Sequence, residues 1–230
     1  MYRVFKRIFD IVASLAALAL LSPVLLVICI ILLLTGERYV FYFQERVGYK
    51  CQKFYIWKFA TMLKNSPNMG AGTITVRNDS RVLPFGRFLR KTKLNELPQL
   101  VNILKGDMSV VGPRPMLQKQ LETFPELTQI YNSYPGLSGV GSIVFRDEED
   151  YVSRAKEPKL FYFECIQPYK AELELWYLEN KSFYVDMWVI ILTLVKIVSD
   201  DNDMIFKVFK TLPKRDMENE LLEFNRQYKA

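Results

Sequence analysis

Residue types that can bind phosphate are concentrated between Arg90 and Pro115. Asn95 and Glu96 set a carboxamide beside a carboxylate, and Arg114 lies in the sequence Gly-Pro-Arg-Pro. Arginine can bind phosphate oxygens through two parallel N–H groups, and a carboxylate can take part in acid–base or metal chemistry. On position alone, Glu96 is more simply explained as a helix N-terminal acid, which stabilises the helix dipole by about 0.3–1 kcal/mol.

Three other charged residues lie in patterns that bear on a site. Lys58, in the sequence WKFATM, falls on a predicted strand among aromatic residues, where an unpaired cation would be costly. It therefore needs an anionic partner, from the protein or from a ligand. Asp107 is more simply a helix cap and Asp79 a turn residue, although neither is excluded as a metal ligand. The sequence holds no Walker loop, no GxGxxG and no HExxH motif.

The sequence around Glu96 predicts an amphipathic helix with Thr92 as its N-cap and its end near Gly106. Pro98 falls in the first turn, where proline is tolerated. Apolar residues recur at spacings of three and four: Leu97, Leu100, Val101 and Leu104. Asn95 and Glu96 would then lie at the helix N-terminus, whose free N–H groups attract anions. The helix would present this pair to a phosphate group.

The rest of the chain predicts a small α+β fold. Aromatic and polar residues alternate on both sides of Gly48, which indicates a β-hairpin within residues 39–62. The Gly-rich stretch 134–142 is typical of a ligand-lining or a tightly packed loop. The other predicted segments are a surface loop (65–80), a short helix (81–90), a helix (150–180) and a charged, peripheral tail after residue 200.

An uncharged apolar run of 24 residues extends from Ile11 to Leu34. As a helix it would be roughly 36 Å long, enough to cross a bilayer core of about 30 Å. Ser22 and Pro23 lie in its middle, where proline kinks a helix, so the run could also dip into the membrane and return to the same face. The upstream basic residues would lie in the cytoplasm. The residues alone leave a spanning anchor and a re-entrant helix equally open.

A second apolar stretch, Phe183–Val198, is shorter and carries Asp186 and Lys196. It indicates an interfacial amphipathic helix, or one packed against the first, rather than a second span. Tyr184 and Trp188 are of the kinds that favour the headgroup zone.

Composition narrows the chemistry. The formal net charge of +6 suits anionic partners such as phospholipids, nucleotide-sugars or nucleic acid. The chain contains no His, so imidazole catalysis and His-ligated metals are excluded. The widely spaced Cys29, Cys51 and Cys165 fit neither a zinc site nor a disulfide framework and agree with a reducing environment.

Four motifs in order resemble the bacterial sugar transferases, the monotopic phosphoglycosyl transferases: KRIFDIV with LLSPVLLV, FQERVGYKCQKFYIWKFATM, LRKTKLNELPQLVNILKGDMSVVGPRP and YPGLSG. The resemblance covers about residues 3–200. It implies an Mg²⁺-dependent enzyme that moves a sugar-1-phosphate from a UDP-sugar to polyprenyl (undecaprenyl) phosphate, releases UMP and initiates polysaccharide or glycoconjugate synthesis. It also implies a re-entrant helix broken at Ser22-Pro23 and a catalytic domain on the cytoplasmic face of the bacterial inner membrane.

The resemblance also assigns site residues. The family uses an Asp-Glu pair, whose Asp attacks the β-phosphate to form a covalent intermediate and whose Glu helps bind Mg²⁺; these positions are Asn95 and Glu96 here. The phosphate-binding residues implied are Lys58, Arg90 and Arg114. A second departure is Ala60, where the family commonly has Arg.

An amide cannot act as a carboxylate nucleophile, which leaves three hypotheses for the reaction. Glu96 or the lipid phosphate itself attacks; the chain binds without turnover; or Asn95 is an engineered trap. The altered Ala60 favours a natural subfamily.

The sequence further predicts how the protein is organised. The expected parts are a basic N-terminus with the re-entrant helix (1–36), a catalytic domain (37–200) and the charged tail (201–230). The predicted partners are a UDP-sugar, polyprenyl phosphate and the membrane, with a homodimer compatible with the packing of the membrane helices. A non-catalytic membrane scaffold would not explain Arg90, Glu96 and Arg114, and a nucleic-acid-binding module would not explain the apolar run.

Overall fold

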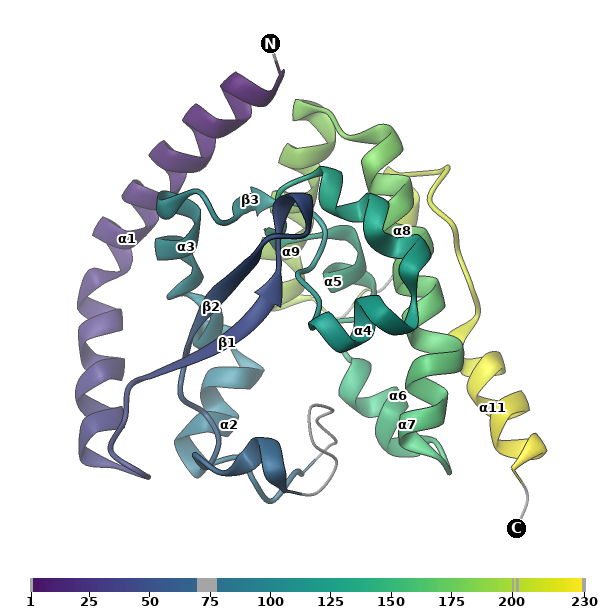
Figure 1. The fold of residues 1–230 in the computed structure, drawn as a ribbon, viewed down its shortest axis with the longest axis horizontal. Helices are drawn as coiled ribbons and strands as arrows, with labels where there is room; N and C mark the ends of the chain where they lie inside the picture. Colours follow the sequence, from purple (N-terminus) through teal and green to yellow (C-terminus); the bar gives the residue numbers. More distant parts are fainter. Residues whose placement is uncertain (1, 70–77, 200, 202, 229–230) are drawn as a thin grey trace.

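The N-terminal apolar run forms one long helix, α1 (Tyr2–Leu34), along one side of the protein in the computed structural model (Figure 1). The helix continues through Ser22 and Pro23, and the hydroxyl of Ser22 donates to the carbonyl of Ala19 at 2.8 Å. Figure 1 shows that α1 changes direction about midway along its length. The predicted break is thus a bend within a continuous helix, as expected where proline removes a backbone hydrogen bond.

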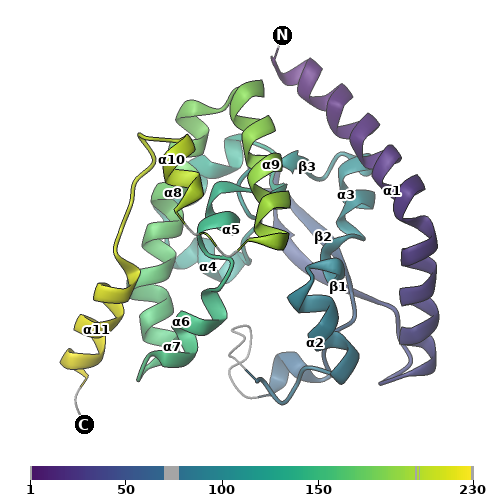
Figure 2. The same cartoon turned by 180° about the vertical axis from the view of Figure 1, so that it is seen from behind.

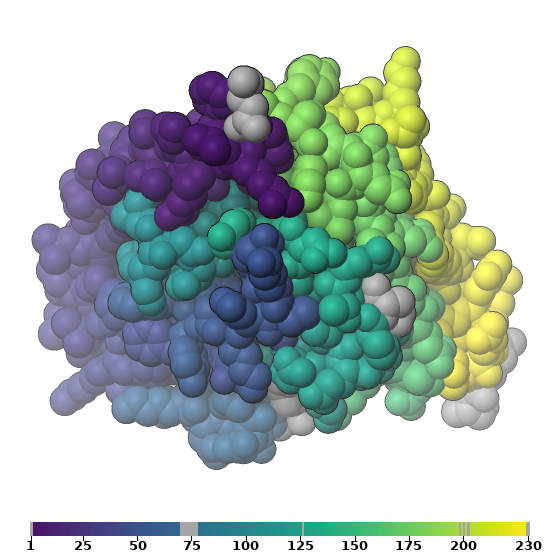
Figure 3. All heavy atoms as spheres, turned by 45° about the horizontal axis from the view of Figure 1, so that its top comes forward, coloured from purple at the N-terminus to yellow at the C-terminus, as the bar shows by residue number. Residues whose placement is uncertain are grey.

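One stripe of α1 packs against the protein and the remainder faces outward. The stripe includes Asp10 and Ser14 in the first half and Ile28 and Leu32 in the second, all buried. The helix is long and apolar enough to cross a membrane, and only 11% of its most apolar part is buried in the protein. The outward face is therefore available to lipid. Figure 3 shows α1 and the C-terminal segment on opposite sides of the molecule.

The structure describes residues 2–69, 78–199, 201 and 203–228. It confirms the predicted α+β fold, which has two small two-stranded sheets among many helices (Figures 1 and 2). After α1 come β1 (Phe41–Val47), η1 (Tyr49–Cys51), β2 (Lys53–Phe59), η2 (Ser66–Asn68), α2 (Pro84–Lys91), η3 (Leu94–Glu96), α3 (Gln99–Lys105), β3 (Ser109–Val111), α4 (Gln118–Thr123), η4 (Pro125–Asn132), β4 (Gly136–Ser138), α5 (Val140–Val144), α6 (Glu148–Arg154), α7 (Pro158–Phe161), η5 (Tyr162–Ile166), α8 (Gln167–Asn180), α9 (Phe183–Val198), α10 (Met204–Val208) and α11 (Met217–Gln227).

The predicted β-hairpin is confirmed as the antiparallel pair β1–β2. Its inner face packs on α3, where Ile56 contacts Leu100 and Ile103 in one buried cluster. Asn102 of α3 fixes the register, because its side chain accepts from the N–H of Trp57 at 2.9 Å and donates to the carbonyl of Tyr55 at 2.8 Å. The hairpin and α3 are thereby held as one rigid unit.

The helix predicted around Glu96, with Thr92 as its N-cap, begins later than predicted, so its predicted start is wrong. Thr92 does not cap α3; it ends α2, where its hydroxyl donates to the carbonyl of Phe88 at 2.8 Å. Lys93 then takes a left-handed conformation (φ 59°), and Asn95 and Glu96 lie in η3, before α3 begins at Gln99. The predicted end is correct, since Gly106 caps α3 with φ 94°. The pair is thus displayed on a tight turn between two helices.

The Gly-rich stretch 134–142 is a tightly packed loop. Its β4 pairs in parallel with β3, and a Cβ added at Gly136 would lie 2.1 Å from the backbone nitrogen of Gly112. Only glycine allows the two backbones to approach so closely.

The predicted surface loop 65–80 falls partly outside the described residues; within them, Ser66–Asn68 form η2.

The predicted helix over 150–180 is in fact several. α6, α7, η5 and α8 follow one another, with residues 155–157 separating α6 from α7. α9 packs against the start of α1, where Lys6 forms a salt bridge of 2.7 Å with Asp186 and Phe9 meets Phe183 edge to face. The outer face of α9 stays apolar, with Ile191, Leu194 and Ile197 exposed.

The prediction of a peripheral tail after residue 200 is wrong. The tail forms α10 and α11, which add apolar side chains to the largest core cluster, together with Leu173 and Trp176 of α8. The tail residues buried in that cluster are Ile205, Phe209, Leu212, Met217, Leu221 and Phe224. The segment was predicted to be peripheral because it contains many charged residues. Its apolar residues nevertheless have an amphipathic spacing, so that they face the core while the charged residues face solvent.

Candidate active site

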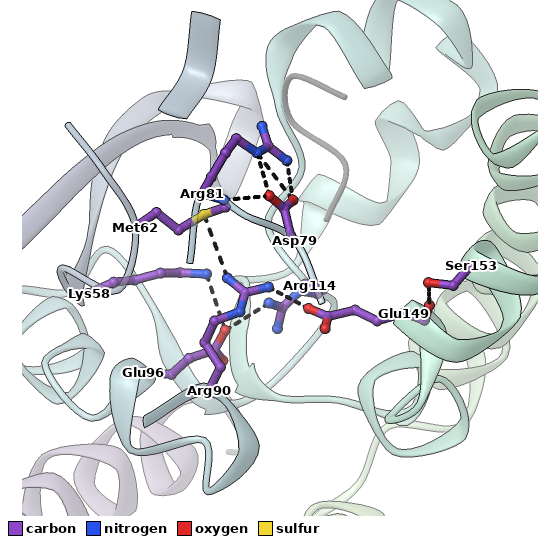
Figure 4. Close-up of polar contacts among 9 residues, drawn as sticks. All are labelled: Lys58, Met62, Asp79, Arg81, Arg90, Glu96, Arg114, Glu149 and Ser153. Atoms are coloured by element: carbon purple, nitrogen blue, oxygen red, sulfur yellow. Dashed lines mark hydrogen bonds and ion pairs between the residues drawn. The ribbon is translucent and has the colours of Figure 1, made fainter. Parts of the chain in front are cut away.

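Glu96 lies among cations that come from separate segments of the chain, and Figure 4 shows Lys58 and Arg114 turned toward it. The cation cluster consists of Arg46, Lys58, Lys93 and Arg114. Its Oε1 accepts a hydrogen bond from Nζ of Lys58 on β2 at 3.1 Å and another from Nη2 of Arg114 at 2.9 Å. The Glu96 side chain is 15% exposed and that of Lys58 16%. The structure therefore brings together three of the predicted site residues and gives Lys58 the anionic partner that the sequence required.

The cluster perturbs the ionisation of its members. Burial alone would raise the pKa of the Glu96 carboxyl, but Arg114 and Lys58 outweigh burial and hold that pKa well below its usual range. Burial, together with the neighbouring Arg114 and Arg46, lowers the pKa of Lys58 to about 8 against the opposing effect of Glu96. One carboxylate thus faces an excess of positive charge, which favours binding of an anion.

Two cations of this cluster were not predicted. Arg46 on β1 shares the inner face of the hairpin with Lys58, and its Nη1 donates to the carbonyl of Pro115 at 3.1 Å. Burial, with Arg114 nearby, lowers the pKa of Arg46 to about 10. The other is Lys93, an exposed residue just before η3, whose charge also helps to lower the pKa of Glu96. The strict alternation of the hairpin could have revealed Arg46, because positions 46 and 58 have the same parity in paired strands.

Arg90 is not bonded to Glu96. Its guanidinium forms an ion pair with Glu149 of α6, and its Nη1 lies 3.9 Å from the sulfur of Met62 (Figure 4). A second carboxylate of α6, Glu148, pairs with Lys170 of α8. The first turn of α6 therefore neutralises two cations that border the cluster.

Asn95 is buried, with 7% of its surface exposed, and its Oδ1 has no hydrogen-bond partner within the described part of the chain. An unpaired buried carbonyl of this kind costs about 1–3 kcal/mol. The position beside Glu96 is thus an expensive one for an amide.

The two aspartates considered as metal ligands have other partners. Asp79 forms a buried ion pair with Arg81 at 2.6 Å (Figure 4). Oδ2 of Asp107 accepts from Nδ2 of Asn102 at 3.1 Å, the same side chain that bonds the backbone of β2. In the described ranges, no three Asp, Glu or Cys side chains are grouped so that they could hold a metal ion.

Comparison with known proteins identifies the family. The family model described as bacterial sugar transferase matches residues 1–200, which contain the whole cluster. An exopolysaccharide production protein, ExoY, of Rhizobium meliloti (strain 1021) is 32% identical over 204 residues, which make up 82% of this chain and 83% of that protein. The exopolysaccharide production protein PSS of Rhizobium leguminosarum bv. phaseoli is 34% identical over 202 residues, covering 84% and 94%.

A third relative is longer. The UDP-glucose:undecaprenyl-phosphate glucose-1-phosphate transferase of Klebsiella pneumoniae is 36% identical over 200 residues, which cover 84% of this chain but only 40% of that protein. The family match over residues 1–200 and the coverage of most of both exopolysaccharide proteins identify the family, and the long apolar helix indicates association with a membrane. This membrane-associated chain belongs to the bacterial sugar transferase family.

Proposed function

We propose that the protein transfers a sugar-1-phosphate from a UDP-sugar to undecaprenyl phosphate, releases UMP and so initiates exopolysaccharide synthesis. The observation that carries this proposal is the excess of positive charge around Glu96. A diphosphate would supply the negative charge that Lys58, Arg114 and Arg46 lack. The name of the Klebsiella relative supports the same donor and acceptor classes; the match covers 40% of that longer protein.

Each cation has a role in this proposal. Arg114 can bind phosphate oxygens through its planar fork, and Lys58 supplies a compact charge on a rigid strand. Arg90 would join them once it leaves Glu149. Their combined charge would stabilise the negative charge that develops on the transferred phosphoryl group.

Mg²⁺ fits this site only together with the substrate. Mg²⁺ at phosphoryl-transfer sites commonly takes one or two carboxylates and completes its shell with phosphate oxygens and water. Both ion pairs of Glu96 use Oε1, which leaves Oε2 for the ion. When bound there, Mg²⁺ would neutralise charge on the diphosphate.

We infer that the lipid phosphate attacks directly. Asn95 offers only an amide, and Glu96 has the oxygen nearest the cations engaged in two hydrogen bonds. A phosphate oxygen of the lipid would form a bond to the β-phosphorus of the UDP-sugar. The bond from that phosphorus to the bridging oxygen breaks, and UMP leaves with the bridging oxygen and its electron pair.

The placement in the membrane is also a proposal. A re-entrant α1, bent at Ser22-Pro23, would put both of its ends and the site at the cytoplasmic face of the inner membrane. Its exposed apolar face and the basic N-terminus support this arrangement. Labelling of single cysteines on both sides of Pro23 tests it, and labelling of the C-terminal end of α1 from the periplasm would contradict it. A homodimer remains a prediction.

Release of UMP from a panel of UDP-sugars, with undecaprenyl phosphate and Mg²⁺ in detergent or nanodiscs, tests the proposed function. We expect release that depends on the lipid and falls about 100-fold or more in Glu96→Gln. Glu179→Gln, which alters an exposed carboxylate of α8, is the matched control. Release no greater than that of Glu96→Gln would instead favour a binding protein without turnover, and a phosphosugar adduct on Glu96 in mass spectra would favour attack by Glu96.

A further inference from the structure

Arg114 reaches the active site from a stretch with a single backbone donor. Pro113 and Pro115 flank it, and proline has no N–H, so Arg114 supplies the only N–H of the three residues. That N–H lies 3.4 Å from Oε1 of Glu174, a residue of α8 that is 60 positions further along the chain. The backbone orientation of Arg114 thus depends on a side chain outside the Gly-Pro-Arg-Pro sequence.

The rest of the stretch is fixed through its carbonyl groups. The N–H of Gly136 donates to the carbonyl of Pro113 at 2.9 Å, and Arg46 donates to the carbonyl of Pro115 at 3.1 Å. Glu174 completes this set by binding the N–H between those two carbonyls. The guanidinium of Arg114 then projects from a backbone held on both sides.

Glu174 is costly to keep where it is. Only 3% of the residue is exposed, and its Oε2 has no hydrogen-bond partner among the residues described. Burial raises the pKa of the Glu174 carboxyl to about 7. The hydrogen bond from the Arg114 N–H opposes this most, followed by the charges of Lys170 and Arg114 and by the backbone N–H of Gly141. Together with burial, the Glu174 charge in turn raises the pKa of Tyr131 of η4. An apolar side chain would fill this space at lower cost, so packing alone does not explain a carboxylate.

The loop after β4 makes room for this carboxylate. A Cβ added at Gly141 would lie 2.7 Å from Oε1 of Glu174, and one added at Gly139 would lie 3.7 Å from it. The first distance is shorter than real Cβ contacts allow. Gly141 therefore lets the carboxylate lie between the loop and the backbone of Arg114.

We propose that Glu174 is a positioning residue, which directs Arg114 toward Glu96 and the donor diphosphate by accepting the Arg114 N–H. This inference rests on the proposed function, because it assumes that Arg114 binds the diphosphate. Glu174 itself touches no reacting atom. Loss of its acceptor oxygen should weaken diphosphate binding through Arg114 alone.

The test measures UDP binding by calorimetry and the melting temperature of the full-length protein in nanodiscs. Glu174→Leu keeps the volume but removes the acceptor, and we expect about ten-fold weaker UDP binding, or 1.4 kcal/mol. In an Arg114→Ala background the same change should have no further effect, because the residue through which it acts is gone. Glu172→Leu, on the same helix but paired with Arg215, is the matched control and should leave UDP binding unchanged.

A second variant keeps the test valid if Glu174→Leu does not fold. Glu174→Gln retains an acceptor oxygen and should bind UDP nearly as the wild type does. The ratio of the two affinities should change between about pH 6 and pH 8, because residue 174 titrates in the wild type alone, whereas the other groups are common to both proteins. Equal weakening by Glu174→Leu with and without Arg114, or an affinity ratio independent of pH, would overturn the inference. A wild type that binds no UDP would overturn the proposed function itself, and this inference with it.

Discussion

Nη2 of Arg114 lies 2.9 Å from Oε1 of Glu96, although the two residues are 18 positions apart and α3 and β3 lie between them. This ion pair joins the turn before α3 to the stretch after β3, and Lys58 joins both to the hairpin. Glu96 therefore accepts hydrogen bonds from the same cations that are proposed to bind the diphosphate. Several consequences of this arrangement can be measured.

Arg114→Lys should raise the KM for the UDP-sugar about ten-fold or more, because lysine cannot donate two parallel hydrogen bonds to phosphate oxygens. Steady-state UMP release over a range of UDP-sugar concentrations measures this effect. Arg87→Lys on the exposed face of α2 is the control and should leave the KM unchanged. An unchanged KM in Arg114→Lys would show that Arg114 contributes only a point charge.

The value of kcat/KM should fall as the pH rises through about 8, because the pKa of Lys58 is lowered to about 8, chiefly by burial. Above that pH the amine is neutral and binds phosphate weakly. A pH profile of kcat/KM measures the fall, which Lys58→Arg should move to higher pH, since arginine stays charged. Lys159→Arg, at an exposed position of α7, should keep the wild-type profile.

The same group makes a signed contribution to stability. The pKa of Lys58 is lower in the folded than in the unfolded protein, so the unfolded chain binds more protons between these values. This contribution to the free energy of unfolding therefore rises with pH from about 8 to about 10.5. A difference in melting temperature between wild type and Lys58→Met that does not change over this range would contradict it.

Glu149→Gln should lower the KM for the UDP-sugar by about three-fold to ten-fold, because the Glu149 carboxylate holds Arg90 in the ligand-free site and competes with phosphate. Removing its charge frees Arg90 without altering a group placed on the diphosphate. Glu157→Gln, an exposed change between α6 and α7, is the control. A raised KM would mean that Glu149 assists binding of the donor.

Asn95→Asp should allow labelled UMP to exchange into the UDP-sugar when no lipid phosphate is present, because a carboxylate at this buried position can form a covalent phosphosugar. The wild type should show no such exchange if the lipid attacks directly. Exchange is measured by radiolabel or mass spectrometry. Exchange by the wild type would show that a covalent intermediate forms without an aspartate, and a large gain in turnover by Asn95→Asp would identify Asn95 as a trap.

Cys51→Gly should stabilise the protein by about 1 kcal/mol, because Cys51 holds a left-handed conformation (φ 58°) in the hairpin turn. Lys50 beside it is also left-handed, with φ 53°, and such turns favour Asn-Gly. Thermal unfolding measures the gain. Cys29→Gly, within helix α1, should have the opposite effect, since glycine lowers helix stability.

The sequence alone determined the elements whose signals are local. The uncharged run specified α1, alternation around Gly48 specified the hairpin, and Gly106 ended α3, since each depends on spacing or backbone freedom within a few residues. The motifs also indicated Glu96, Lys58 and Arg114 as site residues, and the structure brings these three together. The start of α3 was mispredicted because Thr92 can end one helix as well as begin another.

Only the tertiary structure decided which charges meet. Glu174 lies 60 residues beyond Arg114 and carries no local sign of its contact, and Glu149 gives no sign that it neutralises Arg90. The burial of Phe224 and its neighbours in the C-terminal segment was equally hidden among charges. Such contacts arise when distant segments pack, and the energy of a buried charge depends on its neighbours in space, which the order of residues does not fix.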